Sequence, residues 1–420
     1  MDRRTFLRQS GAIASTAVTT LAFPRIAKAY NRKPTIKVLG THVTLQETIR
    51  IQAEKDLGIN IQFFPGGDAE VLLKAATDPR SFDIYEQWSD SIKVLWMADA
   101  IQPIKINKLQ YWPEINELSK TGRLTTAGSI GLGDAPHRIL YFQPDGSLGS
   151  TPADVISFLP YVHNADSFGY NAAVIPRGIP YETESWSWLL DNRYAGKVAI
   201  VNAPTIGIFD LALAAQAQGL VAFNDMGNMS RVEIDALFEI VIAKKRLGHF
   251  RGVWSSVPNS IEWMANGEVI LSSMFSPAVS VLNGRGVPCI YAAPKEGYRA
   301  WHGVMCLSSE TQGEREEAAY AFMNWWLSGW PGAFIARQGY YISNPQRSKT
   351  FMSQAEWDYW YDGKPAAESL LGTDNKIAVR PGDIRTGGSY IKRFENVAIW
   401  NTVMANYEYS LMKWNEFLLA

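Results

Sequence analysis

Arginines next to aromatic and glycine-rich stretches are the residues of this sequence best suited to bind an anion. Arg299 lies two residues before Trp301, so in an extended strand the two side chains share a face. Arg385 lies with Arg380 in the glycine-rich segment 379–389. A guanidinium pairs bidentately with a carboxylate or phosphate, and a glycine turn offers backbone N–H groups to an anion. These arginines therefore predict a small organic acid or zwitterion as ligand; the alternative is ordinary surface pairing with Asp or Glu.

Motifs for cofactor, metal or covalent chemistry are missing from the sequence. We find no G-x-G-x-x-G or G-x-x-x-x-G-K-[ST] loop, no C-x-x-C-H and no G-x-S-x-G. The five histidines are scattered without metal-ligand spacing, and the tandem Tyr340-Tyr341 lacks the further ligands that ferric iron requires. We therefore expect no cofactor, no metal and no catalytic residues. A secreted enzyme that uses paired carboxylates such as Asp83, Glu86 and Asp90 is the rival class.

Composition and charge are those of a globular protein of two or three domains. Of the 420 residues 47% are apolar and 19% are charged, with 40 basic and 41 acidic residues. This balance argues against nucleic acid as a partner, because phosphate binding requires clustered Lys and Arg. The sequence has no run of about 20 apolar residues, which a membrane-spanning helix would need.

The first 29 residues resemble an export signal. Arg3-Arg4 precede Phe6-Leu7, a weakly apolar stretch covers 11–23, and Ala27-Lys28-Ala29 is a small-x-small cleavage site. The paired arginines and the basic residue at the cleavage site favour twin-arginine export over the general secretory route. We therefore predict a periplasmic protein that begins after residue 29.

The two cysteines matter in such an oxidising compartment. Cys289 and Cys306 each lie in a strand-like run, within 287–291 and 303–307. Spacing alone does not show whether their Cβ atoms face each other. A disulfide and two buried free thiols are both open, and the free thiols are favoured.

Strands and helices alternate in the first 70 residues after the signal. Apolar patterns predict strands at 35–39, 59–64 and 82–85, with helices at 45–57, 69–76 and 92–100. This alternation is typical of a parallel sheet with helices on its faces. Because ligands bind at the carboxyl ends of such strands, the loops 40–42, 65–67 and 87–90 should converge.

The same organisation continues after a long excursion at 120–157, which is rich in Gly, Thr, Ser and Pro. The predicted strands are 158–162, 198–201 and 269–272. The predicted helices are 209–218, 230–247, 260–265 and 314–327, of which the second begins with a capping box.

Several short segments, in this order, resemble one known family. They are Phe82-Asp83-Ile84, Phe158-Leu159-Pro160-Tyr161, Gly169-Tyr170-Asn171, Ser185-Trp186, Tyr194-Ala195-Gly196-Lys197, Met264-x-x-Gly267-Glu268-Val269, Pro294-Lys295-Glu296-Gly297, Ala318-Ala319-Tyr320-x-Phe322-x-Asn324, and Gly339-Tyr340 with Asn344. Over residues 34–345 the chain is similar to extracellular solute-binding proteins of ABC importers, in the spermidine/putrescine-binding branch.

This resemblance implies an α/β fold of the periplasmic binding protein type (type II-like), with two doubly wound sheets in two lobes joined by a hinge. Lobe 1 would contain 30–165 and about 300–345, and lobe 2 would contain 166–299 and about 346–420. The expected partners are a small-molecule ligand and an inner-membrane permease, and the protein itself is expected to be a monomer. A role in a sensor instead of a transporter stays open.

The resemblance also assigns residues to the ligand. They are Thr41 and His42 in the first loop, Trp88 and Ser89 in the third loop, Phe275, the stacking residue Trp301, and the late aromatic Tyr340. The alternative for the aromatic residues is a place in the core.

Two departures from the family concern the ligand's charge. The acidic residue expected two positions after Trp301 is Gly303, and the segment 202–207 lacks the expected acidic pair. A buried ammonium group requires a carboxylate partner. A carboxylate or zwitterion is therefore favoured over a polyamine, which stays as the alternative.

Overall fold

The computed structural model describes residues 33–420, so the predicted export signal lies outside the described residues. The first part of the chain forms the expected α/β wing. Its elements in chain order are β1 (Thr35–Thr41), α1 (Glu47–Leu57), β2 (Asn60–Gly66), α2 (Asp68–Thr77), β3 (Ile84–Trp88) and α3 (Ile92–Met97). Strand β1 pairs in parallel with both β2 and β3, which confirms the predicted alternation. Gly58 ends α1 in the left-handed conformation, at φ 68°, which glycine adopts without strain.

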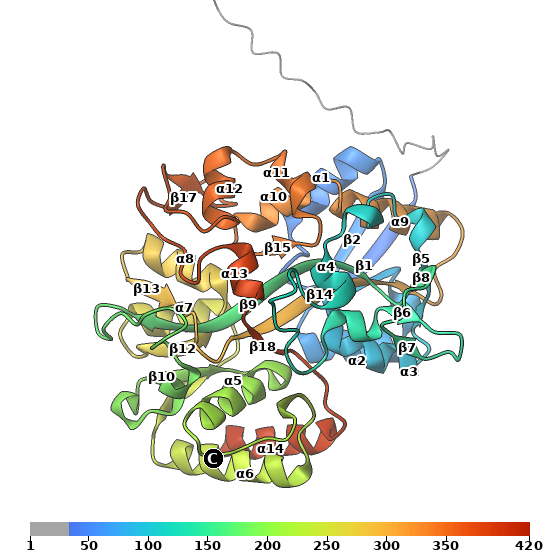
Figure 1. The fold of residues 1–420 in the computed structure, drawn as a ribbon. Helices are drawn as coiled ribbons and strands as arrows, with labels where there is room; N and C mark the ends of the chain where they lie inside the picture. Colours follow the sequence, from blue (N-terminus) through green and yellow to red (C-terminus); the bar gives the residue numbers. More distant parts are fainter. Residues whose placement is uncertain (1–32) are drawn as a thin grey trace, which may run out of the picture.

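Two long antiparallel strands form the centre of the molecule (Figure 1). They are β9 (Leu159–Asn171) and β14 (Tyr298–Ser308), which pair from Arg299↔Asp166 to Met305↔Leu159. Strand β14 pairs with β3 on one side, and β9 pairs with β12 (Leu271–Met274) on the other. The resulting order is β11-β10-β12-β9-β14-β3-β1-β2, so one curled sheet runs through both wings.

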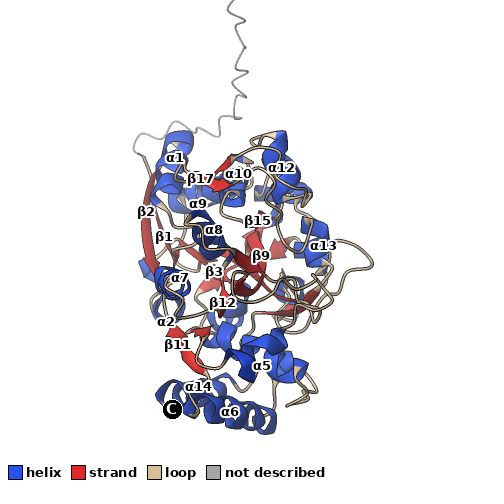
Figure 2. Cartoon of the chain, turned by 90° about the vertical axis from the view of Figure 1, so that its left-hand side faces the viewer, coloured by secondary structure: helices blue, strands red, loops and turns tan. Residues whose placement is uncertain are grey.

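The second wing repeats the α/β arrangement. Its strands β10 (Val198–Val201), β11 (Phe250–Trp254) and β12 are parallel. Its helices are α5 (Pro204–Ala217), α6 (Arg231–Arg246), α7 (Val257–Ala265) and α8 (Ser276–Gly284), and the C-terminal α14 (Tyr407–Leu419) lies beside α6 (Figures 1 and 2). The predicted capping box of α6 is present, with Ser230 and Glu233 bonded to each other's backbone.

The segment after β14 packs along the central strands. It contains α9 (Glu314–Trp326), α10 (Trp330–Ala336), β15 (Tyr341–Ile342), α11 (Pro345–Lys349), α12 (Gln354–Trp360), β16 (Leu370–Leu371), β17 (Ile377–Val379), α13 (Tyr390–Phe394) and β18 (Val397–Trp400). An aromatic cluster that includes Tyr298, Tyr341, Trp360 and Trp400 joins this segment to β14. Strand β18 runs parallel to β14 and leads to α14, which makes a third connection between the wings.

The excursion at 120–157 contributes to a small sheet that is separate from the central sheet. Short strands in and before it form a four-stranded sheet in the order β5-β8-β6-β7. These strands are β5 (Ile104–Lys105), β6 (Tyr141–Phe142), β7 (Leu148–Gly149) and β8 (Val155–Ile156). Helix α4 (Glu117–Thr121) lies at its start.

The two cysteines are buried free thiols, which confirms the favoured alternative. Cys289 lies in β13 (Cys289–Tyr291), which pairs with the end of β9, and Cys306 pairs with Tyr85 in the first wing. The two residues therefore lie at opposite ends of the central strands. Among the described helices, we find none with the length and apolar character that a membrane span requires.

Candidate functional site

Three aromatic side chains from distant parts of the sequence meet where β3 pairs with β14. The rings of Trp88 and Trp301 are 4.7 Å apart, and those of Trp301 and Tyr340 are 5.5 Å apart, both edge to face. Trp301 and Tyr340 are buried and Trp88 is half-buried. Strand pairing brings Trp88 to Trp301. Gly303 lies opposite Trp88, and Trp301 is two residues before Gly303, on the same face of β14. The structure thus brings together three of the residues that the sequence assigned to the ligand.

A buried carboxylate that sequence analysis missed fixes Trp301. The Asp166 side chain accepts hydrogen bonds from Trp301 Nε1 at 2.8 Å, from the Tyr291 hydroxyl at 3.0 Å and from Asn164 Nδ2 at 2.9 Å. Burial raises the pKa of Asp166, while the Arg299 charge and the hydrogen bonds from Tyr291 and Trp301 lower it. The only signal in the sequence was a polar stretch, 163–167, inside a segment otherwise suited to a buried strand.

Arg299 lies on the same face of β14 as Trp301, as predicted, but its guanidinium is held inside the protein. Nε donates to Asp210 Oδ1 at 2.7 Å and Nη1 to Asn401 Oδ1 at 2.9 Å, while Nη2 lies 3.9 Å from Asp166 Oδ2. Arg299 and Asp210 are both fully buried. Burial raises the pKa of Asp210 to about 6, although Arg299 opposes that shift. Arg299 therefore joins β14 to α5 and to the chain after β18.

The predicted loop residues are placed in different surroundings. The backbone N–H and the hydroxyl of Thr41 both donate to Glu86 Oε2, at 3.0 and 3.2 Å, and His42 is exposed. Ser89 is buried directly after Trp88. Phe275 is half-buried at the start of α8, where its ring packs on Trp254 at 5.3 Å.

Another buried carboxyl group, that of Asp90, lies where the two wings meet. Asp90 is 2% exposed, and its Oδ1 has no hydrogen-bond partner. Burial, assisted by the nearby Asp134 carboxylate, raises the pKa of Asp90 to about 7, while a hydrogen bond from Thr205 at the start of α5 opposes the shift. Asp134 is paired with Lys93. Asp90, which was considered above only as a carboxylate of the rival enzyme class, thus places a buried carboxyl group two residues after Trp88.

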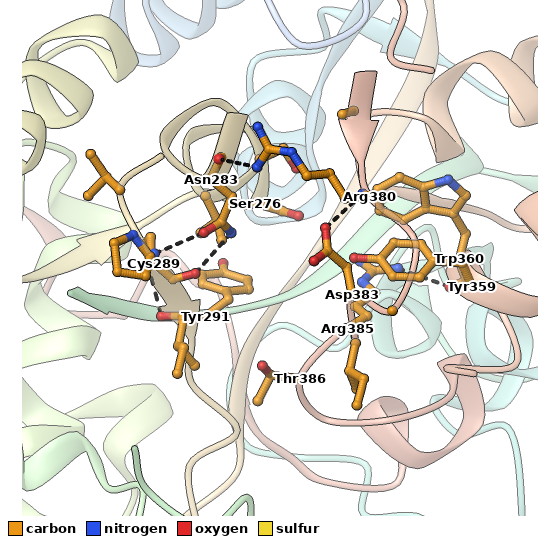
Figure 3. Close-up of a pocket in the computed structure, with 18 of the residues that line it drawn as sticks. Ser276, Asn283, Cys289, Tyr291, Tyr359, Trp360, Arg380, Asp383, Arg385 and Thr386 are labelled. Carbon is orange, nitrogen blue, oxygen red and sulfur yellow. Dashed lines mark hydrogen bonds between the residues drawn. The ribbon is translucent and has the colours of Figure 1, made fainter. Parts of the chain in front are cut away.

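A cavity of about 410 Å³ lies between α8 and the segment 378–386 (Figure 3). We call it the α8 crevice. Arg385 lies in its wall and donates from Nη1 to the Trp360 carbonyl at 3.0 Å and from Nη2 to the Gly339 carbonyl at 2.6 Å. Its guanidinium also lies over the Tyr341 and Trp360 rings. Gly339 directly precedes Tyr340 in the sequence. Arg385 is therefore hydrogen-bonded to the residue next to one member of the aromatic group.

Comparison with known proteins identifies the family. Residues 51–358 match the family of bacterial extracellular solute-binding proteins. The chain belongs to this family. A search of curated protein sequences finds no match to this solute-binding protein.

Solved structures of similar architecture confirm the two-lobe fold of this solute-binding protein. A putative spermidine/putrescine ABC transporter protein from Listeria monocytogenes has a TM-score of 0.65 at 13% identity, over 92% of this chain and 99% of its own. The spermidine/putrescine substrate-binding protein of Streptococcus pneumoniae gives 0.60 at 11%, over 92% and 100%. A binding protein from A. tumefaciens in complex with agropinic acid gives 0.57 at 11%, over 93% and 100%. At these identities the likeness concerns the fold.

The part of this solute-binding protein that the structure describes, 33–420, contains no group of three or more His, Cys, Asp or Glu side chains placed to hold a metal ion. The side chains gathered between the wings are aromatic rings, carboxylates and guanidiniums. Such groups bind organic molecules by stacking and by charge pairing.

Proposed function

We propose that this protein captures a small organic solute between its two lobes and delivers it to the permease of an ABC importer. The family supports an extracellular binding role, and several structural neighbours are named as ABC transporter proteins. The sequence of the first 29 residues supports twin-arginine export to the periplasm. The protein acts as a monomeric binding component without catalytic turnover.

The observation that carries this proposal is the aromatic group Trp88–Trp301–Tyr340 at the centre of the shared sheet. The bond to Asp166 holds the indole of Trp301 in one orientation before any ligand arrives. Preorganised aromatic faces bind an organic group at a low cost in side-chain entropy. Contacts with both lobes would then shift the population toward a closed form that the permease recognises.

For the solute we propose a carboxylate or a zwitterion. Arg385 donates a hydrogen bond to the carbonyl of Gly339, the residue before Tyr340. Its hydrogen-bond partners are carbonyl oxygens and not carboxylates, so its charge is available to a ligand carboxylate. Two structural neighbours are named for agropinic acid and for GABA. Thr41, His42, Ser89 and Phe275 remain predicted ligand contacts.

A polyamine is the second candidate, and Asp90 is the observation that favours it. The sequence places Gly303 where the polyamine branch has an acidic residue. Asp90, which follows Trp88 by two residues, supplies a buried carboxylate with one unpartnered oxygen. A ligand ammonium group would complete that hydrogen bonding and pair the charge.

The lobe boundaries are proposed as 30–165 with about 300–345, and 166–299 with about 346–420. The long strands β9 and β14 and the strand β18 are the crossings that support a hinge there.

Isothermal titration of ligand-stripped mature protein tests the proposal. Small carboxylates, amino acids and polyamines are titrated into wild type, Trp88→Ala and the control Trp263→Ala, which alters a half-buried Trp on α7. We expect one solute to bind with 1:1 stoichiometry, at least tenfold more weakly to Trp88→Ala and unchanged to Trp263→Ala. Equal affinity in all three proteins would refute the aromatic site, and binding of polyamines alone would establish the second candidate.

A further inference from the structure

We propose that the α8 crevice is an anion-binding site, in which Arg385 and Arg393 bind a small oxyanion such as a carboxylate or a phosphate. The crevice is distinct from the aromatic group, because Trp88, Trp301 and Tyr340 do not line it. The proposal therefore does not depend on the aromatic site, although it shares Arg385 with the choice of a carboxylate solute proposed above.

The wall of the α8 crevice carries an excess of positive charge. Four arginines line the crevice, namely Arg177, Arg380, Arg385 and Arg393, against one carboxylate, that of Asp383. Asp383 Oδ2 accepts the backbone N–H of Arg380 at 2.8 Å. Within residues 33–420, no ion pair of 4.0 Å or less joins any of the four guanidiniums to a carboxylate.

Arg393 has neutral hydrogen-bond partners. This side chain is 0% exposed; Nη1 donates to the Thr386 carbonyl at 2.7 Å and Nη2 to the Ala165 carbonyl at 2.8 Å. Its Nε is buried without a hydrogen-bond partner. The guanidinium lies 4.7 Å from the centre of the Tyr298 ring. Carbonyl oxygens and a ring face attract the cation, but they do not neutralise it.

Arg385 is likewise a buried guanidinium with neutral partners. It is 8% exposed, and carbonyl oxygens and two aromatic rings are its partners. Charged side chains in protein interiors are paired as a rule, because the loss of hydration is unfavourable for an isolated ion. The Asp166 carboxylate interacts electrostatically with Arg393, but it is shared with Arg299. Two adjacent buried cations that lack an ion pair of their own, beside an open cavity, are the arrangement that an external anion completes.

The remaining wall of the crevice suits an oxyanion. Ser276, Ser280 and Asn283 follow one another along one face of α8, four and three residues apart. Thr386 lies below Ser276 and Asn283 in Figure 3. The hydroxyls of Ser276, Ser280 and Thr386 are suited to donate hydrogen bonds to an anion. The Asn283 amide instead bonds the Cys289 backbone, since its Nδ2 donates to the carbonyl at 3.0 Å and its Oδ1 accepts the N–H at 2.9 Å. A volume of about 410 Å³ accommodates a small organic acid as well as an inorganic ion.

Occupancy of the crevice would couple two parts of the molecule. Helix α8 belongs to the second wing, whereas Arg385 and Arg393 come from the segment that follows α12. Arg385 also holds the Gly339 carbonyl, next to Tyr340 of the aromatic group. A bound anion would therefore fix α8 relative to the 378–393 segment on one side of the proposed solute site.

The experiment titrates inorganic phosphate and succinate, each against sodium chloride of equal ionic strength, into ligand-stripped mature protein. Calorimetry and thermal unfolding are measured for wild type, Arg385→Gln, Arg380→Gln and the control Arg80→Gln. Arg380 and Arg80 are exposed, so these two variants keep the core intact. We expect one anion per chain, at least tenfold weaker binding to Arg385→Gln, about threefold weaker binding to Arg380→Gln, and no change in Arg80→Gln.

A complementary variant, Ser280→Asp, places a carboxylate in the crevice wall. We expect its midpoint of unfolding without added anion to exceed that of wild type, and its shift with phosphate to disappear. The proposal is overturned if neither phosphate nor succinate binds folded wild type, or if Arg380→Gln and Arg385→Gln both bind as wild type does.

Trp88→Ala separates the two proposals and the two sources of the anion. Retained phosphate binding in this variant, with loss of the organic solute, supports an independent anion site. Competition between phosphate and the organic solute in wild type would show that the crevice holds the acidic group of the solute itself, which also supports an anion site. Phosphate binding that is lost in Trp88→Ala but kept in Arg385→Gln would contradict the assignment.

Discussion

Replacement of Arg299 by methionine tests whether the buried ion network holds the crossing strands together. The substitution keeps a long, flexible side chain and removes the guanidinium. Asp210 then loses its partner at 2.7 Å, Asn401 loses its partner at 2.9 Å, and the positive charge near Asp166 is removed. All four residues are buried, so water does not replace the lost partner without a rearrangement of β14, α5 and the chain after β18.

The expected cost follows from this burial. Removal of one member of a buried ion pair typically costs about 3–5 kcal/mol, since the other charge stays buried and unpaired. For ~390 residues, the entropy of unfolding is about 0.8 kcal/mol/K, so this loss lowers the midpoint by about 4–6 °C. The matched control is Arg251→Met, which breaks the half-exposed pair with Glu268 and should cost at most about 1 kcal/mol.

The pH dependence gives an independent check. Asp210 has a pKa of about 6 in the folded protein even with Arg299 present, against ~3.9 when unfolded. Without Arg299 the pKa rises further, so the folded variant binds a proton more readily than wild type. Its deficit in unfolding free energy should therefore be largest near pH 8 and shrink as the pH falls through 6.

Urea unfolding at pH 8 and pH 5 measures both effects, and Arg299→Met/Asp210→Asn should recover part of the loss. A deficit below about 1 kcal/mol at pH 8, no larger than that of Arg251→Met, would refute the reasoning. So would a deficit that grows as the pH falls.

Two further predictions concern other buried groups. Burial lowers the pKa of His302 to about 4, so the folded state binds fewer protons than the unfolded state below pH ~6.5; we expect stability from this group to fall as the pH drops from ~6.5 to 4, by up to about 1.4 kcal/mol per pH unit. NMR of the imidazole should show no titration above pH 5, and a midpoint near 6.5 would contradict the burial argument. Burial also raises the pKa of Cys289 to about 12 and that of Cys306 well above its usual value. We expect native protein at pH 8 to resist a thiol reagent and denatured, unreduced protein to react at both cysteines, whereas a chain two mass units lighter that does not react would reveal a disulfide.

Local patterns determined most of the elements. Gly58 ends α1 because a left-handed residue satisfies the last carbonyls of the helix, and the Ser230/Glu233 box begins α6 by bonds within four residues. The alternation of strands and helices likewise predicted the first wing. Two parallel strands need a crossover connection, usually a helix, and that helix lies between them in the sequence. Such signals involve residues close together in the sequence, so they can be predicted without knowledge of the tertiary structure.

The length of strand β9 could not be predicted from local sequence patterns. The apolar run predicted only 158–162, but the strand continues to Asn171 through the polar stretch 163–167. Those polar residues are buried because distant elements supply partners. Asp166 accepts from Trp301 of β14 and Tyr291 of β13, and His163 bonds Tyr390 of α13. Without its partner strand, the same stretch reads as a loop.

The sequence by itself determined the fold class, the order of the elements and the aromatic residues at their ends, because these depend on local periodicity and turn chemistry. Tertiary structure decided which charges are paired. Arg299 and Arg385 looked equivalent in the sequence, but folding brought the Asp210 carboxylate, 89 positions away, to Arg299, whereas it brought carbonyl oxygens and two aromatic rings to Arg385. The difference lies in contacts between distant segments, whose register is set by the packing of the whole sheet and not by any neighbouring residue.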